Sequence, residues 1–352
     1  MEIEDILQLA AKKSASDIHM SPGSPLMLRI DGEMVPQSDE KIRPDEVQKT
    51  ILPIMTLEQI QLLKDKGELD FAFSIAGFSR IRVNVFSQRG TYAAALRLLS
   101  FEIPDAENLG LPQSITALTG KKRGLILVTG ATGSGKSTTL ASLIDIISKK
   151  YAKNIITLED PIEYLHSHQR SIVSQREIGS DTRSYSNALR AALRQDPDVI
   201  LVGEMRDLET ISIAITAAET GHLVLSSLHT NSAAETINRI IDVFPPYQQQ
   251  QIRIQLAGVI EGIVAQQLLP KCDGVGRTAV FEVMLANPAI RNLIRDAKAF
   301  QIPTVIQTCK KEGMLTMDDA IAESYRKGLI KQNTAVIFAH DPEAMSRKLN
   351  HF

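Results

Sequence analysis

The stretch Gly130-Ala131-Thr132-Gly133-Ser134-Gly135-Lys136-Ser137 decides how this chain folds, because it matches the phosphate-loop pattern G-x-x-x-x-G-K-[S/T]. Residues 125–128, all apolar, come shortly before it and predict a strand, and residues 138–149 predict a helix. Glycines in such a loop let backbone N–H groups converge on phosphates, and the start of the helix adds partial positive charge. The sequence therefore predicts a strand, loop and helix that bind a nucleoside triphosphate.

Two side chains of this loop have specific expected roles. Lys136 is placed to reach the β- and γ-phosphates, and the Ser137 hydroxyl to ligate Mg²⁺. The other loop residues expected at the nucleotide are Gly130, Thr132, Gly133, Ser134, Gly135 and Thr138. The alternative interpretation is a glycine-rich turn with an incidental lysine.

The region around the loop alternates between strands and helices. Near-continuous apolar strands are expected at residues 125–129, 155–158, 199–202 and 223–227, with helices between them. Strands of this kind are typical of a parallel sheet that is covered on both faces. From about residue 235 to the end, the pattern predicts mostly helices.

Carboxylates follow two of these strands. Glu204 comes two residues after the end of the strand at 199–202, where phosphate-loop proteins bring an acid to the metal. Glu159, Asp160 and Glu163 lie within five residues near the end of another strand. Such a dense cluster can hold a cation or accept a proton from water, although a solvated acidic loop has the same pattern. From the residues alone, either Glu163 or Glu204 could be the general base.

The first hundred residues have a different, α+β pattern. An Asp31-Gly32 pair between alternating residues predicts a hairpin, and further strands are expected at 70–75, 78–86 and 92–99. Residues 103–112 contain two prolines, one glycine and no periodicity, which indicates a connection between domains. We therefore expect one domain at 1–102, a linker at 103–118 and a second domain at 119–352.

Composition excludes several classes of protein. The 352 residues include 39 Lys and Arg against 41 Asp and Glu, so the net charge of −2 argues against a dedicated nucleic-acid binder. With two cysteines, the chain cannot form a four-cysteine zinc site. No apolar run reaches the roughly 18 residues of a membrane span, and the acidic start is unlike a signal peptide. We expect a cytoplasmic protein with no nucleic acid, no zinc and no direct membrane insertion.

Further segments carry a family resemblance over essentially the whole chain. Together they resemble the secretion-type (GspE/PilB/PilT) ATPases, and residues 289–295 resemble a helix typical of the branch that retracts type IV pili. The matching segments are 15–19 (ASDIH), 130–137 (Walker A), 156–164 (Asp box), 201–207 (Walker B), 220–231 (His box) and 289–295 (AIRNLIR). Asp296, where the family often has Glu, keeps the charge.

The resemblance implies an α/β protein with a PAS-like α+β domain at 1–102, followed by a RecA-like domain with a parallel sheet and C-terminal helices at about 235–352. It implies ATP and Mg²⁺ as ligands, with Ser137 and Glu204 at the metal. It gives Glu163 the role of activating water, and it places His229 near the γ-phosphate or a neighbouring subunit. Arg82 and Arg97 would reach the γ-phosphate, although arginines that alternate with Val and Ile also fit the solvated face of a sheet.

As a function, the resemblance implies a homohexameric ATPase that retracts type IV pili and drives twitching motility. Its partner would be the inner-membrane platform protein of the pilus machine, so that the protein is cytoplasmic and peripheral at the inner membrane. One alternative is a pilus-assembly or type II secretion ATPase of the same family. A RecA-like nucleic-acid motor and a nucleotide-controlled switch with little turnover are more distant alternatives.

Overall fold

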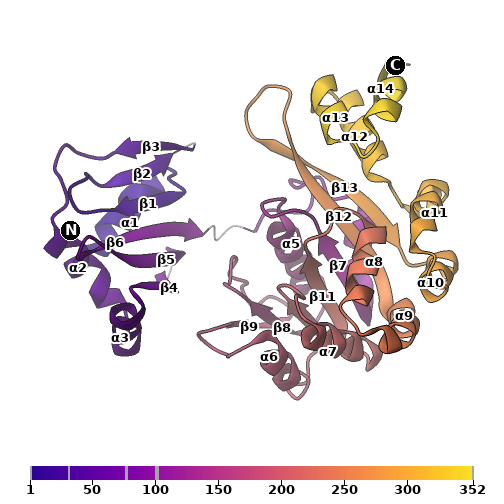
Figure 1. The fold of residues 1–352 in the computed structure, drawn as a ribbon, viewed down its shortest axis with the longest axis horizontal. Coiled ribbons are helices and arrows are strands. Elements are labelled where there is room, and N and C mark those ends of the chain that lie inside the picture. Colours follow the sequence, from indigo (N-terminus) through magenta and orange to yellow (C-terminus); the bar gives the residue numbers. More distant parts are fainter. Residues whose placement is uncertain (1, 31, 76–77, 100–102, 351–352) are drawn as a thin grey trace. The chain divides into compact units, whose positions relative to one another are not determined.

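The computed structural model describes residues 2–30, 32–75, 78–99 and 103–350 (Figure 1). It contains two compact units. The first consists of Met1–Glu102 with Glu163–Leu165, and the second of Ile103–Ile162 with His166–Phe352.

The first unit is built on a six-stranded antiparallel sheet in the order β3-β2-β1-β6-β5-β4. Its strands are β1 (Asp17–Met20), β2 (Met27–Ile30), β3 (Glu33–Pro36), β4 (Glu68–Ile75), β5 (Ser79–Gln88) and β6 (Thr91–Leu99). The expected hairpin is present as β2 and β3, although Asp31 of its turn lies outside the described residues.

Three helices share one hydrophobic core with this sheet. They are α1 (Ile3–Lys12), α2 (Pro44–Ile51) and α3 (Leu57–Lys66), and the short turn η1 (Leu52–Ile54) follows α2. On β5, Ile81, Val83 and Val85 are buried, whereas Arg82 is exposed. The alternation predicted from the sequence is confirmed, because successive residues of a strand point to opposite faces.

The second unit is built on a seven-stranded sheet in the order β13-β12-β7-β11-β10-β8-β9. Its strands are β7 (Gly124–Thr129), β8 (Asn154–Glu159), β9 (Ile172–Glu177), β10 (Val199–Val202), β11 (Leu223–Leu228), β12 (Ile260–Pro270) and β13 (Arg277–Leu285). All neighbours are parallel except β12 and β13. The sheet is therefore mostly parallel, as expected from the sequence, and the hairpin of β12 and β13 adds one antiparallel pair at its edge.

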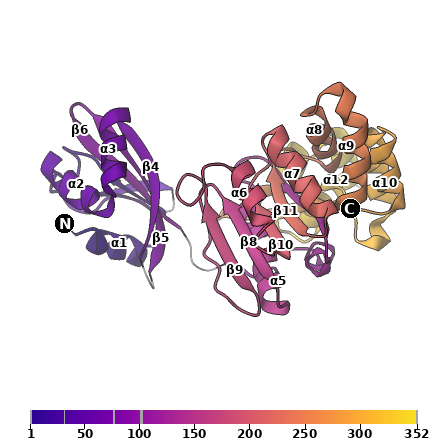
Figure 2. The ribbon, with the colours of Figure 1, turned by 90° about the horizontal axis from the view of Figure 1, so that it is seen from below.

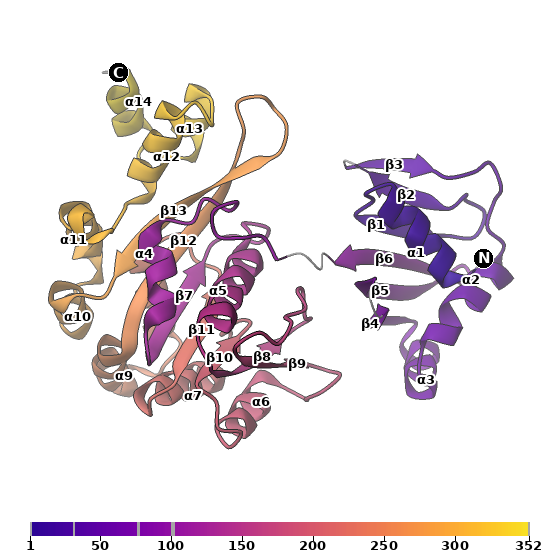
Figure 3. The same ribbon diagram turned by 180° about the vertical axis from the view of Figure 1, so that it is seen from behind.

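Helices cover both faces of the sheet. Residues of β7 alternate between two core clusters, with Leu125 and Leu127 in one and Ile126 and Val128 in the other. The first cluster includes α6 (Tyr185–Ala192), α7 (Leu208–Glu219), α8 (Ala233–Asp242), α9 (Pro246–Val259), α10 (Pro288–Arg295), η3 (Ala299–Gln301) and α11 (Ile302–Thr308). The second includes α4 (Gln113–Ala117), η2 (Leu118–Gly120) and α5 (Lys136–Lys150). Figure 2 shows α5 and α6 on opposite sides of the strands, and Figure 3 shows α4 beside β7.

The sequence suggested that residues 235–352 are mostly helical, but the structure also has two strands in this region. Strands β12 and β13 form a long hairpin in this region, and β12 pairs directly with β7. Beyond it, a separate core cluster joins the hairpin to the C-terminal helices, which lie beside the hairpin in Figure 1. These are α12 (Met317–Arg326), α13 (Gln332–Phe338) and α14 (Pro342–Asn350), preceded by the turn η4 (Lys310–Glu312).

The expected linker at 103–118 is also shorter than predicted. Its last part forms α4 and the start of η2, where Ile115 and Leu118 are buried in the core of the second unit. The apolar spacing of these two residues suits a short helix, so only the preceding residues, 103–112, lack regular structure.

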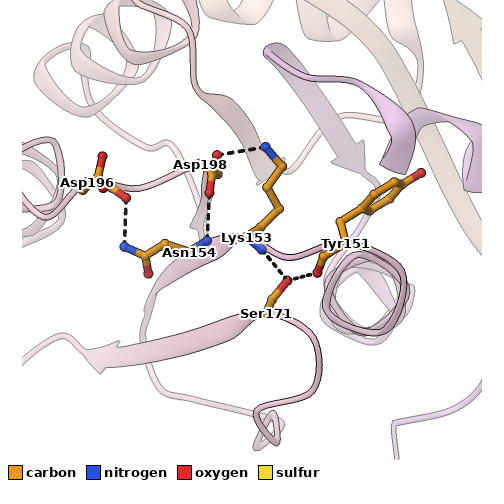
Figure 4. Close-up of polar contacts among 6 residues, drawn as sticks. All are labelled: Tyr151, Lys153, Asn154, Ser171, Asp196 and Asp198. Carbon is orange, nitrogen blue, oxygen red and sulfur yellow. Dashed lines mark hydrogen bonds and ion pairs between the residues drawn. The ribbon is translucent and has the colours of Figure 1, made fainter.

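A polar network fixes the starts of β8, β9 and β10 (Figure 4). The Asp198 carboxylate accepts hydrogen bonds from Lys153 Nζ (2.8 Å) and from the Asn154 N–H (2.9 Å). Ser171 Oγ accepts from the Lys153 N–H at 3.1 Å and donates to the Tyr151 carbonyl at 2.6 Å. Although burial alone would raise the pKa of Asp198, its bonds to Lys153 and Asn154 lower it, so the carboxylate stays charged. This end of the strands is thereby held in register, and the expected catalytic acids follow their opposite ends.

Candidate functional site

The phosphate loop lies between β7 and α5, as its sequence predicts. Gly130, Gly133 and Gly135 have φ values of 148°, 76° and 89°, which L side chains rarely adopt. Gly135 is the N-cap of α5, a helix of 15 residues whose first N–H groups have no partner within the helix. The loop and the helix start together form the anion-binding geometry that a nucleotide phosphate requires.

Lys136 is buried at 9% exposure and folds back over the loop. Its Nζ donates to the carbonyl oxygens of Gly130 and Ala131, each at 3.0 Å. Two hydroxyl oxygens nearby in the chain, Thr129 Oγ1 and Ser134 Oγ, are buried without a hydrogen-bond partner among the described residues. Because buried polar groups are normally paired, this donor set fits an anionic ligand at the loop.

The remaining loop side chains differ in exposure. Thr132 and Ser137 are exposed, and Thr138 is half-buried at the start of α5. Ser137 therefore has the accessibility that a metal-ligating hydroxyl needs. Among the described residues, no three His, Cys, Asp or Glu side chains converge as a metal-binding group. A Mg²⁺ ion at this loop would draw most of its oxygen ligands from phosphates and water, as Mg²⁺ commonly does.

Glu204 follows β10, and its side chain is only 12% exposed. Arg206 Nε lies 2.5 Å from Glu204 Oε1, and His229 Nε2 lies 3.4 Å from Oε2. His229 comes directly after β11, which runs between β7 and β10, so the sheet order brings it to the acid. Glu204 is thus held between two basic side chains.

A pocket of ≈ 390 Å³ opens at this place. Its polar lining includes Glu204, Arg206, His229 and Arg239, and apolar residues such as Ile211 complete the wall. The pocket lies at the carboxyl ends of β10 and β11, where ligands of open α/β sheets commonly bind.

The carboxylates that follow β8 have separate environments. Glu159 Oε1 accepts from Thr157 Oγ1 at 2.5 Å and from Gln175 Nε2 at 3.1 Å. Glu163 is exposed and is grouped with the first unit.

Tyr185 lies near these acids, a position that the sequence did not predict. Burial, followed by the negative charges of Asp160 and Glu204, raises the pKa of its phenol, which therefore stays protonated beside the acids.

The two arginines of the first unit lie directly opposite each other on β5 and β6. Arg97 Nε donates to Asp17 Oδ1 at 2.8 Å, and Arg82 Nε lies 3.8 Å from Asp70 Oδ1. Their side chains are 61% and 46% exposed. The register therefore gathers the two guanidinium groups on one exposed row of the sheet.

His222 lies at the other end of β11 from His229. Its Nδ1 is 2.8 Å from the Ala217 carbonyl and 3.2 Å from Thr220 Oγ1. These contacts close the turn between α7 and β11. The structure therefore separates the two histidines of the His box, and only His229 is beside Glu204.

Helix α10 contains the motif at 289–295. Ile290 and Ile294 are buried, and Arg291 donates to the carbonyls of Ala257 and Gly258 at 2.6 and 2.9 Å. Arg291 also pairs with Glu261 at 2.8 Å. It therefore caps the C-terminal end of α9, a structural role that the sequence did not reveal.

Gln266 is a further residue that the sequence did not single out. It lies on β12 and contacts the phosphate loop through its side-chain amide. Its only signal in the sequence is that it belongs to a pair of polar residues, Gln266 and Gln267, with apolar residues on both sides.

In the part of the chain that the structure describes, no helix has both the length and the apolar character of a membrane span.

Comparisons with known proteins extend over nearly the whole chain. The family described as "Type II/IV secretion system protein" matches residues 1–335. "Type IV pilus retractation ATPase PilT" of Pseudomonas aeruginosa is 44% identical over 343 residues, which cover 97% of this chain and 99% of the relative. A "Twitching motility protein" of Neisseria gonorrhoeae is 43% identical over 91% of this chain and 86% of its own length. A solved structure described as "Crystal Structure of the Pilus Retraction Motor PilT and Bound ADP" superposes with a TM-score of 0.93 at 48% identity, covering 99% of both chains.

Proposed function

The chain belongs to the family of type II/IV secretion system proteins, and from this premise we propose that it is an ATPase that powers the retraction of type IV pili and thereby twitching motility. The observation that carries this proposal is the 44% sequence identity with the Pseudomonas aeruginosa retraction ATPase, which extends over 97% of this chain and 99% of the relative. The similarity to a twitching motility protein agrees with it. The phosphate loop gives the proposal its chemistry.

ATP would bind with its phosphates against residues 130–138. Lys136 would exchange the carbonyls of Gly130 and Ala131 for phosphate oxygens, which are stronger acceptors for an ammonium group. Ser137 and Glu204 would hold Mg²⁺, directly or through water. The ion supplies positive charge that stabilises the phosphoryl group during transfer. The similar solved structure of a pilus retraction motor contains bound ADP, which supports a nucleotide at this loop.

Hydrolysis needs a group that accepts a proton from the attacking water. We assign this role to Glu163, following the family resemblance, and metal binding to Glu204. Because Glu204 is held by Arg206 and His229, its carboxylate has a fixed position at the end of β10. His229 would respond to the γ-phosphate through this contact.

Arg82 and Arg97 would neutralise charge that develops on the γ-phosphate. Their common row on β5 and β6 supports a joint role, since one rigid sheet presents both guanidinium groups. Nucleotide state would then control how the two units move, which is a common way for a phosphate to drive conformational change. The working assembly would be a homohexamer at the inner membrane, bound to the platform protein of the pilus machine.

A pilus-assembly or type II secretion ATPase is the less favoured alternative. The two cysteines of the chain, Cys272 and Cys309, provide no tetracysteine segment, and residues 289–295 match the retraction branch. Deleting the gene in a piliated host that carries it distinguishes the two. Retraction predicts more surface pili and no twitching, whereas loss of all pili would contradict retraction and indicate assembly.

A further inference from the structure

Gln266 is a buried polar residue on β12, the second strand from one edge of the sheet, and the proposed reaction gives it no role. Its side chain is 3% exposed, and Val264 and Ala265, which precede it on the same strand, are completely buried. Strand β12 lies beside β7, which leads into the phosphate loop. A polar side chain at such a place needs partners, because burial without hydrogen bonds is costly.

The Gln266 amide bridges the loop and the helix that follows it. Its Nε2 donates to the Ser134 carbonyl at 2.7 Å, and its Oε1 accepts from Thr139 Oγ1 at 2.7 Å. Ser134 belongs to the loop and Thr139 to the first turns of α5, and both are buried. One side chain therefore fixes the loop relative to the start of the helix, which is the geometry on which phosphate binding depends.

Two loop glycines are shaped by the same residue. A Cβ atom at Gly135 would lie 2.9 Å from Gln266 Nε2, and one at Gly130 would lie 2.4 Å from the Gln266 carbonyl oxygen. The loop thus approaches β12 so closely that only glycine fits at these positions. The close approach of β12 therefore explains why glycine occurs at these two positions of the loop.

The opposite face of β12 contacts another part of the second unit. Ala265 and Leu269 belong to the core cluster that contains Ile321 of α12 and Ala335 of α13. Since alternate residues of a strand point to opposite faces, β12 presents Gln266 to the loop and Ala265 to the C-terminal helices. A shift of the loop that pulls on Gln266 would therefore move a strand on which these helices pack.

We propose that Gln266 is a positioning residue that holds the phosphate loop in its nucleotide-binding form and connects the loop to the C-terminal helices through β12. The inference rests on the proposed ATPase function. Gln266 acts through Ser134 and Thr139, and it does not touch the nucleotide. Without its amide, the Ser134 carbonyl and the Thr139 hydroxyl lose their buried partner, so the loop relaxes towards water and must be reordered by the ligand.

The first test compares ADP affinity, measured by calorimetry, in four variants and the wild type. Gln266→Leu removes both hydrogen bonds at similar volume and should weaken ADP binding about 10–100-fold. Thr139→Val removes only one bond and should have a smaller effect, whereas Thr139→Ser keeps the hydroxyl and should bind nearly as the wild type does. Gln267→Leu, on the other face of β12, is the matched control and should also bind normally.

ATPase kinetics separate positioning from general damage. Gln266→Leu should raise KM for ATP in parallel with the loss of ADP affinity, while the melting temperature without nucleotide changes little. Equal ADP affinity and KM in Gln266→Leu and wild type would overturn the inference. If Gln266→Leu does not fold, the pair Thr139→Val and Thr139→Ser decides, because equal affinity in these two variants contradicts the bridge. A wild type that binds no ADP and hydrolyses no ATP would instead refute the proposed function.

Hydrogen exchange tests the connection to the C-terminal helices. In the wild type, saturating ADP should slow exchange in α12 as well as in the loop. In Gln266→Leu, saturating ADP should slow exchange in the loop but much less in α12. The same slowing of α12 in both proteins, or no slowing in the wild type, would overturn the connection.

Discussion

Replacing Gly130 by alanine should impair nucleotide binding far more than the same change at Gly133. A Cβ atom at Gly133, where φ is 76°, costs about 1–2 kcal/mol of backbone strain, and at Gly130, where φ is 148°, it costs about 1–3 kcal/mol. At Gly133 the new atom would meet nothing within 4 Å. At Gly130 it would lie 2.4 Å from the Gln266 carbonyl oxygen and 2.5 Å from Ser134 Oγ. The first of these is a backbone atom in a paired strand, which cannot move cheaply.

The overpacking at Gly130 adds about 1–3 kcal/mol to the strain. If the loop relieves this cost by leaving its binding conformation, Gly133→Ala should lose about 5–30-fold in ADP affinity, and Gly130→Ala about 30-fold or more. Titration calorimetry with ADP measures both values, and circular dichroism checks that the variants remain folded. Equal affinities of the two variants would contradict a loop held tightly against β12, because the added atom meets close neighbours only at Gly130.

Glu163→Gln and Glu204→Gln should each retain bound ATP while the rate of hydrolysis falls by about 10²–10⁴, and unchanged turnover in either would remove that residue from the mechanism. Arg291→Ala should lower the free energy of unfolding, measured in urea, by about 1–3 kcal/mol, because the three hydrogen bonds of Arg291 are lost. The folded variant should keep near-normal turnover. A loss of turnover without a loss of stability would contradict this structural role. Burial lowers the pKa of His166 to about 4, so between pH 6.5 and 4 the unfolded chain binds more protons than the folded one, and stability should fall by about 2 kcal/mol as the pH decreases through this window. His166→Gln should lessen that fall in urea titrations, and identical pH profiles would argue against a buried neutral histidine.

The sequence predicts the part of the second unit in which strands are continuous apolar runs. Strands β7, β8, β10 and β11 were all expected within one or two residues, because strands that are buried on both faces need no polar positions. Strand β12 was missed, since Gly262 and the pair Gln266-Gln267 interrupt its apolar pattern. The amide of Gln266 is tolerated there because the phosphate loop and α5 both provide hydrogen-bond partners, and distant partners leave no local signal.

The candidate site also has one part that the sequence predicts and another part that only the structure reveals. The phosphate loop is predictable, because all of its groups are neighbours in the chain and the backbone itself binds the ligand. The contact of His229 with Glu204 depends on β11 lying between β7 and β10, and strand order cannot be read from alternating helices and strands. Arg206 is two residues after the expected acid, yet its ion pair depends on how the turn after β10 directs its side chain.

The first unit shows what periodicity can and cannot predict. The alternation along β5 correctly placed Arg82 on the exposed face, because a strand has a fixed period of two. That Arg97 lies directly opposite is a matter of register, which the hairpin between β5 and β6 determines. The pairing of Arg97 with Asp17 joins segments 80 residues apart and is accessible only from the structure.

In the proposed function, ATP held at Lys136 powers retraction. This role is tested most directly by returning either the wild-type gene or Lys136→Ala to a deletion strain at equal protein level and filming labelled pili. Pili should shorten with the wild-type protein and stay extended with Lys136→Ala. Normal shortening in the presence of Lys136→Ala would contradict this role.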